Sequence, residues 1–275
     1  MEFYGLLGEK LSHSLSPEIH TRIFDLINVK AAYKLFEVKE EDMEKFTQGL
    51  KVLKIKGSNV TIPYKEKVMK YLDEISEEGK KIGAINTIYL KENKLYGYNT
   101  DYYGFGIMLE ANDIQIKNKK AVILGNGGAT KAALHYLLDK EVEKIYIVSR
   151  NPKVDNYKLN KVEIIGYDNI KNINGDILIN STPIGMYPQN GDSPVDKEVI
   201  NNFKILVDLI YNPEETEFLR IGKTLNKKTI GGLYMLVAQA VKAEEIWNNI
   251  KIDEEVIKEI YKEVNLKFKR NILNL

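Results

Sequence analysis

The chain has 275 residues and a mass of 31.5 kDa, a length that predicts two domains or one large α/β unit. Hydrophobic residues make up 44% of it and charged residues 29%, which excludes wholesale disorder, and the net charge of +1 gives no general attraction to nucleic acid or acidic membranes. The absence of cysteine excludes disulfide bonds, thiolate metal sites and a cysteine nucleophile.

The first hundred residues alternate between strand and helix patterns, which favours an α/β fold. In the helix expected at residues 17–28, Ser16 is the expected N-cap and Pro17 occupies the first helical position. A polar turn at residues 91–93 separates two strand patterns and predicts a hairpin. We expect strands at Glu2–Gly8, Tyr33–Val38, Lys56–Thr61, Ile85–Leu90 and Lys94–Tyr98, and helices at Pro17–Asn28, Glu40–Leu53 and Tyr64–Leu72.

After Asp101 the pattern changes to short apolar runs separated by longer segments, which is typical of buried strands in a parallel sheet. We place the domain boundary near residues 101–104, which gives a first domain at 1–101 and a second at 102–234. Residues 235–275 are expected to fold back onto the first domain. The expected strands are Ala121–Leu124, Ile145–Ser149, Val162–Ile165, Ile177–Asn180, Ile205–Leu209 and Lys228–Ile230, and the expected helices are Phe105–Ala111, Leu233–Trp247 and Glu254–Val264.

A glycine-rich turn follows the first strand of the second domain. Gly125 permits a tight turn, and Gly127 lets the backbone approach a pyrophosphate at the amino end of the next helix. Thr130 stands where a third glycine is usual. The alternative is a turn without a ligand, but the strand before it and the helix after it favour nucleotide binding.

The next strand ends in Ser149-Arg150 with no carboxylate to accept a ribose 2′-hydroxyl. Arg150, with Lys153 as a second candidate, is suited to pair with a 2′-phosphate, and the alternative is a solvated surface arginine. In the first domain, Ser14 and Ser16 alternate in a loop before a helix and form a candidate carboxylate cradle, unless Ser16 only caps the helix.

These motifs, in this order, resemble the shikimate dehydrogenase family over nearly the whole chain. They are Ser14-x-Ser16-Pro17, residues 59–65 (Asn-Val-Thr-Ile-Pro-Tyr-Lys), 83–87 (Gly-Ala-Ile-Asn-Thr), 99–101 (Asn-Thr-Asp), 125–129 (Gly-x-Gly-Gly-Ala), 180–186 (Asn-Ser-Thr-Pro-x-Gly-Met), Asp208-x-x-Tyr211-x-Pro213, and 235–240 (Met-Leu-x-x-Gln-Ala). Without this resemblance, we would interpret Lys65 as a solvated surface charge, and Asn86 and Asp101 as turn residues.

The resemblance implies an α/β fold: an N-terminal substrate domain with a mixed sheet, and a Rossmann-type doubly wound parallel sheet that binds NADP. It implies that Lys65 and Asp101 are the catalytic pair, although the residues alone do not divide the acid–base role between them. The implied substrate-binding residues are Ser14, Ser16, Thr61, Lys65, Asn86, Asp101, Tyr211 and Gln239. The implied cofactor-binding residues are Gly125, Asn126, Gly127, Gly128, Ala129, Ser149, Arg150, Thr182, Met186, Leu209 and Gly232.

The chain departs from the family pattern at Asn126, at Asn151 and Val154 after the second strand of the second domain, and at Tyr234 near the expected nicotinamide position. These changes leave the reaction class unaltered, but they bear on the strictness of phosphate recognition and on the shape of the nicotinamide pocket.

The resemblance implies an NADP-dependent oxidoreductase that reduces 3-dehydroshikimate to shikimate in aromatic amino acid biosynthesis. The alternatives are a quinate/shikimate dehydrogenase that uses NAD, a non-catalytic ligand sensor on the same fold, and an amino-acid or methylene-folate dehydrogenase. The Lys65–Asp101 pair argues against the sensor, and Ser14 and Ser16 argue against the last.

Composition adds expectations about partners and location. Three histidines leave little material for a zinc site, so no metal is expected. No signal segment and no apolar stretch of about 20 residues is visible. We therefore expect a cytoplasmic monomer or homodimer that acts on a small molecule and binds neither nucleic acid nor membrane.

Overall fold

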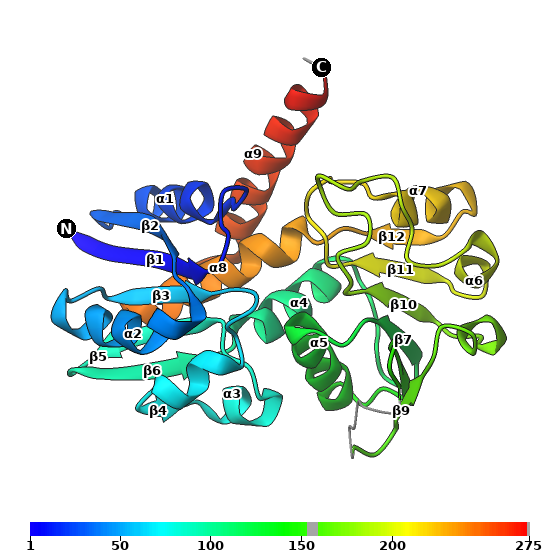
Figure 1. The fold of residues 1–275 in the computed structure, drawn as a ribbon. Helices are drawn as coiled ribbons and strands as arrows, with labels where there is room; N and C mark the ends of the chain where they lie inside the picture. Colours follow the sequence, from blue (N-terminus) through cyan, green and yellow to red (C-terminus); the bar gives the residue numbers. More distant parts are fainter. Residues whose placement is uncertain (153–158, 274–275) are drawn as a thin grey trace. The chain divides into compact units, whose positions relative to one another are not determined.

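The computed structural model describes residues 1–152 and 159–273, with side chains described up to residue 267. The chain divides into two units. Unit 1 comprises Met1–Gly104 and Val237–Val264, and unit 2 comprises Phe105–Leu236 and the chain from Asn265 onward. We describe each unit by itself (Figure 1).

Unit 1 contains a six-stranded sheet in the order β2-β1-β3-β5-β6-β4. The strands β1, β2 and β3 are parallel, whereas β5 is antiparallel to both β3 and β6. The predicted mixed sheet is therefore confirmed. The strands are β1 (Glu2–Gly8), β2 (Ala31–Glu37), β3 (Gly57–Val60), β4 (Glu74–Ile75), β5 (Thr87–Lys91) and β6 (Lys94–Tyr98).

Helices cover both faces of this sheet (Figure 1). On one face, Tyr4 packs with Phe24 of α1 and Trp247 of α8, and Trp247 occupies the space left by the missing side chain of Gly57. The other face packs on α2 and on the turn after β3. The helices of this unit are α1 (Ser16–Leu26), α2 (Met43–Val52), α3 (Glu77–Ile82), α8 (Leu233–Asn248, in this unit from Val237) and α9 (Glu254–Leu273, in this unit up to Val264), with 3-10 helices η1 (Glu40–Asp42) and η2 (Lys67–Tyr71).

Unit 2 contains a six-stranded, wholly parallel sheet in the order β12-β11-β10-β7-β8-β9. This is the doubly wound order of a dinucleotide-binding fold, with its switch point between β7 and β10. The Rossmann-type prediction is confirmed. The strands are β7 (Lys120–Leu124), β8 (Lys144–Val148), β9 (Val162–Ile165), β10 (Ile177–Asn180), β11 (Ile205–Asp208) and β12 (Lys228–Ile230).

Both faces of this second sheet are also covered. The apolar side chains of α6 and α7 pack with one face, where Phe203 and Phe218 are fully buried. Elsewhere in the unit, α4 contacts α5 through an edge-on pair of rings, Phe105 and Tyr136. The helices are α4 (Thr100–Ala111, in this unit from Phe105), α5 (Gly128–Asp139), α6 (Lys197–Asn201) and α7 (Glu217–Thr224), with the 3-10 helix η3 (Ile170–Asn172).

Three predicted elements were wrong in detail. Ser16 is not the N-cap of α1: Leu15 holds that position, and the Ser16 amide donates to Ser14 Oγ at 3.2 Å. The predicted helix at 64–72 is only the 3-10 helix η2, at Lys67–Tyr71, in which Val68 is the buried residue. The helix predicted from Phe105 begins five residues earlier, at Thr100, where the Thr100 amide donates to a side chain from outside the helix.

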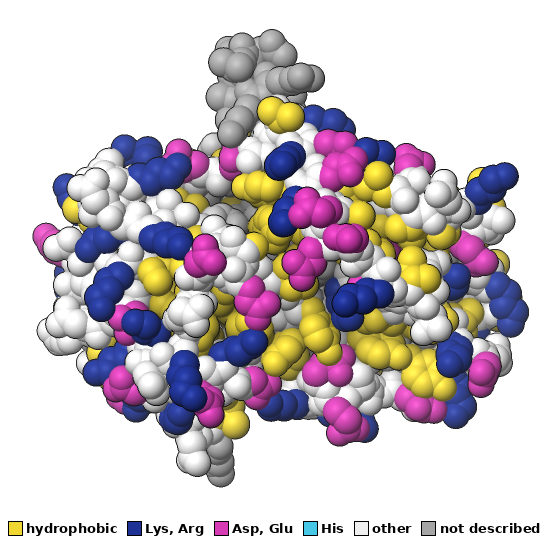
Figure 2. All heavy atoms as spheres, turned by 180° about the vertical axis from the view of Figure 1, so that it is seen from behind, with side chains coloured by type: hydrophobic (Ala, Val, Ile, Leu, Met, Phe, Trp, Pro, Cys, Tyr) yellow, Lys and Arg dark blue, Asp and Glu magenta, His cyan; other side chains and the backbone are white. Residues whose placement is uncertain are grey.

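Charged side chains of both signs are interspersed over the face drawn in Figure 2, with hydrophobic side chains exposed between them. This mixture agrees with the balance of 40 basic and 39 acidic residues. The view shows no broad area of one sign.

Candidate functional site

Lys65 and Asp101 form the ion pair predicted as catalytic. Lys65 Nζ lies 2.6 Å from Asp101 Oδ2, and the two side chains are only 15% and 9% exposed. Lys65 lies in the segment after β3, where its carbonyl accepts the Ile85 amide at 2.7 Å. Asp101 lies in the first turn of α4, where the helix dipole favours a negative charge. The pair is therefore held at both ends and shielded from most solvent.

A buried polar cluster positions the start of α4 beside this pair. Asn86 Oδ1 accepts the Thr100 amide at 2.6 Å, and Asn86 Nδ2 donates to Thr100 Oγ1 at 3.0 Å. Gln239 Oε1 lies 3.4 Å from both Asn86 Nδ2 and Thr100 Oγ1. Asn99 Nδ2 donates to the Ala84 carbonyl at 2.8 Å. Two predicted substrate-binding residues, Asn86 and Gln239, are thus brought together from positions 153 residues apart.

Ser14, Ser16 and Thr61 follow the carboxyl ends of neighbouring parallel strands. Ser14 and Ser16 come after β1, and Thr61 comes directly after β3. The Thr61 amide donates to the Leu7 carbonyl at 2.9 Å, and the Ser14 amide donates to the Leu11 carbonyl at 3.0 Å. Because these strand ends share one edge of the sheet, the fold places three hydroxyl groups at that edge.

The glycine turn in unit 2 has the shape of a phosphate cradle. Gly125 has a φ of +98°, a conformation that other residues rarely adopt. A Cβ built on Gly127 would project into open space, with no described atom within 4 Å. The α5 helix begins directly afterwards, and its first-turn amides lack acceptors within the helix. These residues fit a dinucleotide pyrophosphate.

Thr130, which replaces the third fingerprint glycine, has a structural role that the sequence did not reveal. Its hydroxyl accepts the Gly127 amide at 3.1 Å, donates to the Gly125 carbonyl at 3.2 Å and lies 2.6 Å from Ser181 Oγ. Because a hydroxyl carries a single proton, Thr130 cannot donate to the Gly125 carbonyl and to Ser181 Oγ at the same time. Thr130 thus ties the turn after β7 to the residue after β10, on the two sides of the switch point.

Ser149 and Arg150, the residues predicted to bind a 2′-phosphate, directly follow β8. Ser149 is buried, and its Oγ accepts the Asn151 amide at 3.1 Å. Arg150 is exposed. Lys153, the predicted second cation, and the departure at Val154 lie outside the described residues.

Of the remaining predicted cofactor residues, Thr182 and Met186 follow β10, Leu209 follows β11, and Gly232 follows β12. Asn180 Oδ1 accepts both the amide and the hydroxyl of Thr182, and the Asn180 carbonyl accepts the Leu209 amide at 2.9 Å. A Cβ on Gly232 would lie 2.4 Å from the Leu209 carbonyl oxygen, so glycine is required there. Met186 is 44% exposed. Tyr211, the predicted substrate residue in unit 2, has its pKa raised by burial.

Asp208 is a buried carboxyl group to which we assigned no role from the sequence. It accepts from Asn180 Nδ2 at 3.1 Å, from the Ile210 amide at 3.0 Å and from Thr216 Oγ1 at 2.6 Å. Burial raises its pKa from 3.8 to about 6, despite these three hydrogen bonds, which lower it. Asp208 therefore fixes the segment that carries Leu209 and Tyr211.

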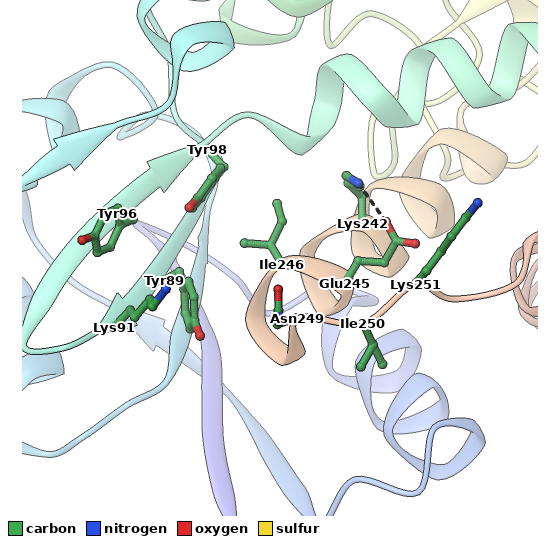
Figure 3. A pocket seen from close by; sticks show the side chains of 10 residues that line it. All are labelled: Tyr89, Lys91, Tyr96, Tyr98, Lys242, Glu245, Ile246, Asn249, Ile250 and Lys251. Carbon is green, nitrogen blue, oxygen red and sulfur yellow. Dashed lines mark hydrogen bonds and ion pairs between the residues drawn. The ribbon is translucent and has the colours of Figure 1, made fainter.

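A separate surface groove of about 770 Å³ lies in unit 1 between the β5–β6 hairpin and the end of α8. Figure 3 shows Tyr89, Tyr96 and Tyr98 on the hairpin, and on α8 the pair of Lys242 and Glu245, which lie 2.8 Å apart. The groove contains none of the predicted site residues. Its other lining residues are Lys91, Ile246, Asn249, Ile250 and Lys251.

Among the described residues, no group of three or more His, Cys, Asp or Glu side chains is arranged to hold a metal ion. Within the same part of the chain, no helix is long and apolar enough to cross a membrane.

Comparisons with known proteins agree on one family. The model of the shikimate dehydrogenase substrate binding domain matches residues 6–88, and that of the shikimate 5′-dehydrogenase C-terminal domain matches residues 232–260. A Clostridium beijerinckii protein named shikimate dehydrogenase (NADP(+)) is 57% identical over 98% of this chain and 100% of its own length.

Solved structures give the same result. Shikimate dehydrogenase 1 from Peptoclostridium difficile is 55% identical, with a TM-score of 0.93 over 98% of this chain and 99% of that one. Shikimate 5-dehydrogenase from Thermus thermophilus, in complex with NADP(H) and shikimate, is 29% identical, with a TM-score of 0.86 over 96% of this chain and 99% of that one.

Proposed function

The chain belongs to the shikimate dehydrogenase family, and we infer that it is an oxidoreductase that interconverts shikimate and 3-dehydroshikimate with NADP. In biosynthesis it works in the direction of reduction, toward shikimate and the aromatic amino acids. The reaction moves a hydride to or from carbon and a proton to or from the neighbouring oxygen.

The observation that carries this proposal is the shielded Lys65–Asp101 pair. The carboxylate that holds the Lys65 ammonium group is buried and lies in the first turn of α4. The cluster of amide side chains described above lies beside it. In the reduction, the Lys65 ammonium donates a proton to the forming alkoxide, and in the oxidation its neutral amine accepts one. Asp101 orients the lysine and accepts a hydrogen bond from the reacting hydroxyl.

The other polar groups of unit 1 account for the rest of the substrate. Ser14 and Ser16 bind its carboxylate, since hydroxyl groups at the start of a helix suit an anion. Thr61, Asn86 and Gln239 bind its ring hydroxyls, and Tyr211 of unit 2 contacts substrate and nicotinamide. The groups in unit 1, which comprises Met1–Gly104 and Val237–Val264, belong to the proposed substrate domain, expected from the sequence at residues 1–101 with 235–275.

Residues 102–234 form the NADP-binding domain. The cradle at Gly125–Ala129 receives the pyrophosphate, and Arg150 with Ser149 receives the 2′-phosphate. Asn126, Thr182, Met186, Leu209 and Gly232 complete the cofactor site. Bound NADP supplies the nicotinamide that accepts or donates the hydride. We extend the proposal to a metal-independent, cytoplasmic enzyme that acts as a monomer or homodimer.

Initial rates with two substrates and two cofactors test this function. The change in absorbance of reduced nicotinamide is followed with shikimate or quinate, each with NADP or NAD. We expect the highest kcat/KM for shikimate with NADP. A higher value for quinate with NAD would favour a quinate/shikimate dehydrogenase, and no turnover in any combination would favour a ligand sensor.

A further inference from the structure

Tyr33, on strand β2, is hydrogen-bonded to the polar groups of the substrate domain, although no sequence motif pointed to it. Its hydroxyl donates to Asn59 Oδ1 at 2.7 Å. A carbonyl oxygen has no proton, so the Tyr33 proton is the one in this bond. Burial raises the pKa of the Tyr33 hydroxyl well above its usual value, and the neighbouring Ser16 side chain partly opposes this rise.

Asn59 carries the connection onward to the ring-hydroxyl end of the site. Its Nδ2 donates to the Asn86 carbonyl at 3.3 Å and to Thr87 Oγ1 at 3.1 Å. Thr87 Oγ1 in turn lies 3.2 Å from Asn86 Oδ1 and 3.1 Å from Thr100 Oγ1. Asn59 is 5% exposed and Thr87 is fully buried, so water does not readily replace these bonds.

The Tyr33 ring stacks on a buried histidine of α1. His20 stacks on it with ring centroids 4.2 Å apart and an interplanar angle of 11°. His20 itself is fully buried, and its Nδ1 lies 2.6 Å from Glu244 Oε1 on α8. Two elements, α1 and α8, therefore fix the direction in which the Tyr33 hydroxyl points.

We propose that Tyr33 is a positioning residue for substrate binding: through Asn59, it holds the Asn86–Thr87–Thr100 group in the arrangement that receives the substrate's ring hydroxyls. This rests on the proposed function. Without the Tyr33 hydroxyl, Asn59 Oδ1 loses its donor inside a buried cluster, and the amide groups must be ordered when the substrate binds. The free energy needed to order these groups weakens substrate binding more than it slows the proton transfer at Lys65.

A matched control stands directly opposite on the neighbouring strand. Tyr4 of β1 is the register partner of Tyr33, is buried to 1% exposure, and donates its hydroxyl to Asn248 Oδ1 at 3.2 Å. Tyr4→Phe and Tyr33→Phe each remove one tyrosine hydroxyl from the same face of the unit. Only Tyr33→Phe removes one that contacts Asn59.

The test measures kcat, KM for shikimate and the unfolding midpoint of the parent, Tyr33→Phe and Tyr4→Phe at saturating NADP. We expect KM for shikimate to rise about three- to tenfold in Tyr33→Phe, the range for one lost hydrogen bond, with kcat changed by less than about twofold. Tyr4→Phe keeps KM within about twofold. An unchanged KM in Tyr33→Phe, or an equal rise in Tyr4→Phe, would overturn the proposal.

A double-variant cycle tests the route through Asn59. In an Asn59→Ala background, Tyr33→Phe should change KM by less than about twofold, because the connection is already broken. A further threefold rise or more would show that Tyr33 acts elsewhere. KM does not depend on the amount of folded enzyme, so partial unfolding leaves this comparison valid. If Tyr33→Phe does not fold, Tyr33→His replaces it, because imidazole still stacks on His20 but is too short to reach Asn59 as the phenol does.

Turnover by the parent enzyme distinguishes a failure of the proposed function from a failure of the positioning role of Tyr33. A parent without turnover of shikimate overturns the proposed function and this inference with it. An active parent whose Tyr33→Phe variant has an unchanged KM overturns the positioning role alone.

Discussion

Lys65→Met tests the proposed proton transfer most sharply. It removes the ammonium group 2.6 Å from Asp101 Oδ2 and keeps a side chain of similar length. A general acid–base group contributes about 10²- to 10⁴-fold, which corresponds to roughly 3–5 kcal/mol of the activation free energy. We therefore expect kcat at saturating substrate to fall by at least about a hundredfold.

The same change has a smaller effect on folding. Asp101 is 9% exposed, so its unpaired carboxylate keeps some contact with solvent. Removing one partner of a fully buried pair costs about 3–5 kcal/mol, and partial solvation of this one lowers that to roughly 1–3 kcal/mol. At about 2–4 °C per kcal/mol, the unfolding midpoint falls by several degrees, and the variant remains folded at 25 °C.

Lys67→Met is the matched control. Lys67 lies two residues away and pairs with Glu40, but these side chains are 44% and 61% exposed. An exposed pair contributes about 0–1 kcal/mol, so both kcat and the unfolding midpoint should stay close to the parent's. Asp101→Asn and the double variant with Lys65→Met complete the series. If the pair acts as a unit, the double variant is no slower than the worse single one.

Stopped assays of kcat, together with thermal unfolding by circular dichroism, give both quantities for each variant. The proposed proton transfer by Lys65 is wrong if Lys65→Met keeps kcat within about tenfold of the parent, or if its activity falls only in proportion to the loss of folded protein.

Three further predictions concern the two ends of the site and a buried carboxyl group. Ser14→Ala and Ser16→Ala should raise KM for shikimate with little change in kcat, because a carboxylate remote from the reacting carbon is bound equally throughout the reaction; a fall in kcat alone would contradict this. Arg150→Ala should lower the ratio of kcat/KM for NADP over NAD by about one to two decades, the value of a charge-assisted contact, and an unchanged ratio would show that the 2′-phosphate binds elsewhere. Burial raises the Asp208 pKa to about 6, so the folded state holds a proton that the unfolded state releases near pH 4. Stability from this group is therefore present below about pH 4 and is lost, by roughly 3 kcal/mol, as the pH rises through 6. Urea unfolding across this range should show that slope in the parent and a flatter profile in Asp208→Asn, and equal slopes would contradict the assignment.

The strands of unit 2 could be predicted closely from the sequence because most are short runs rich in Ile, Leu and Val; the central strands β7 and β10 are almost wholly buried, whereas the edge strands β9 and β12 are only partly buried. The bounds of β9, β10 and β12 agree with the expected ones to the residue. The strand β4 could not be predicted, because its two residues form a strand only by pairing with Tyr96 and Gly97 of β6. The helix α4 begins at Thr100 rather than Phe105 because a distant side chain, Asn86, accepts the first amide.

The candidate site, like the fold, could be predicted only in part from local sequence patterns. Ser14, Ser16 and the glycine turn follow predicted strands, so local patterns indicated their chemistry. Lys65 and Asp101 are 36 residues apart, and no periodicity predicts that they meet; the family motifs supplied that pair. The contact of His20 with Glu244, across 224 residues, had no motif at all, and it was seen only in the folded chain.

Transfer of deuterium from shikimate to the cofactor tests whether the chain moves a hydride between shikimate and NADP. Shikimate carrying deuterium at the carbon whose hydroxyl is oxidised is incubated with the chain and NADP, and both products are examined by mass spectrometry. We expect one deuterium in NADPH for each 3-dehydroshikimate formed. Unlabelled NADPH, or no 3-dehydroshikimate at all, would contradict this expectation.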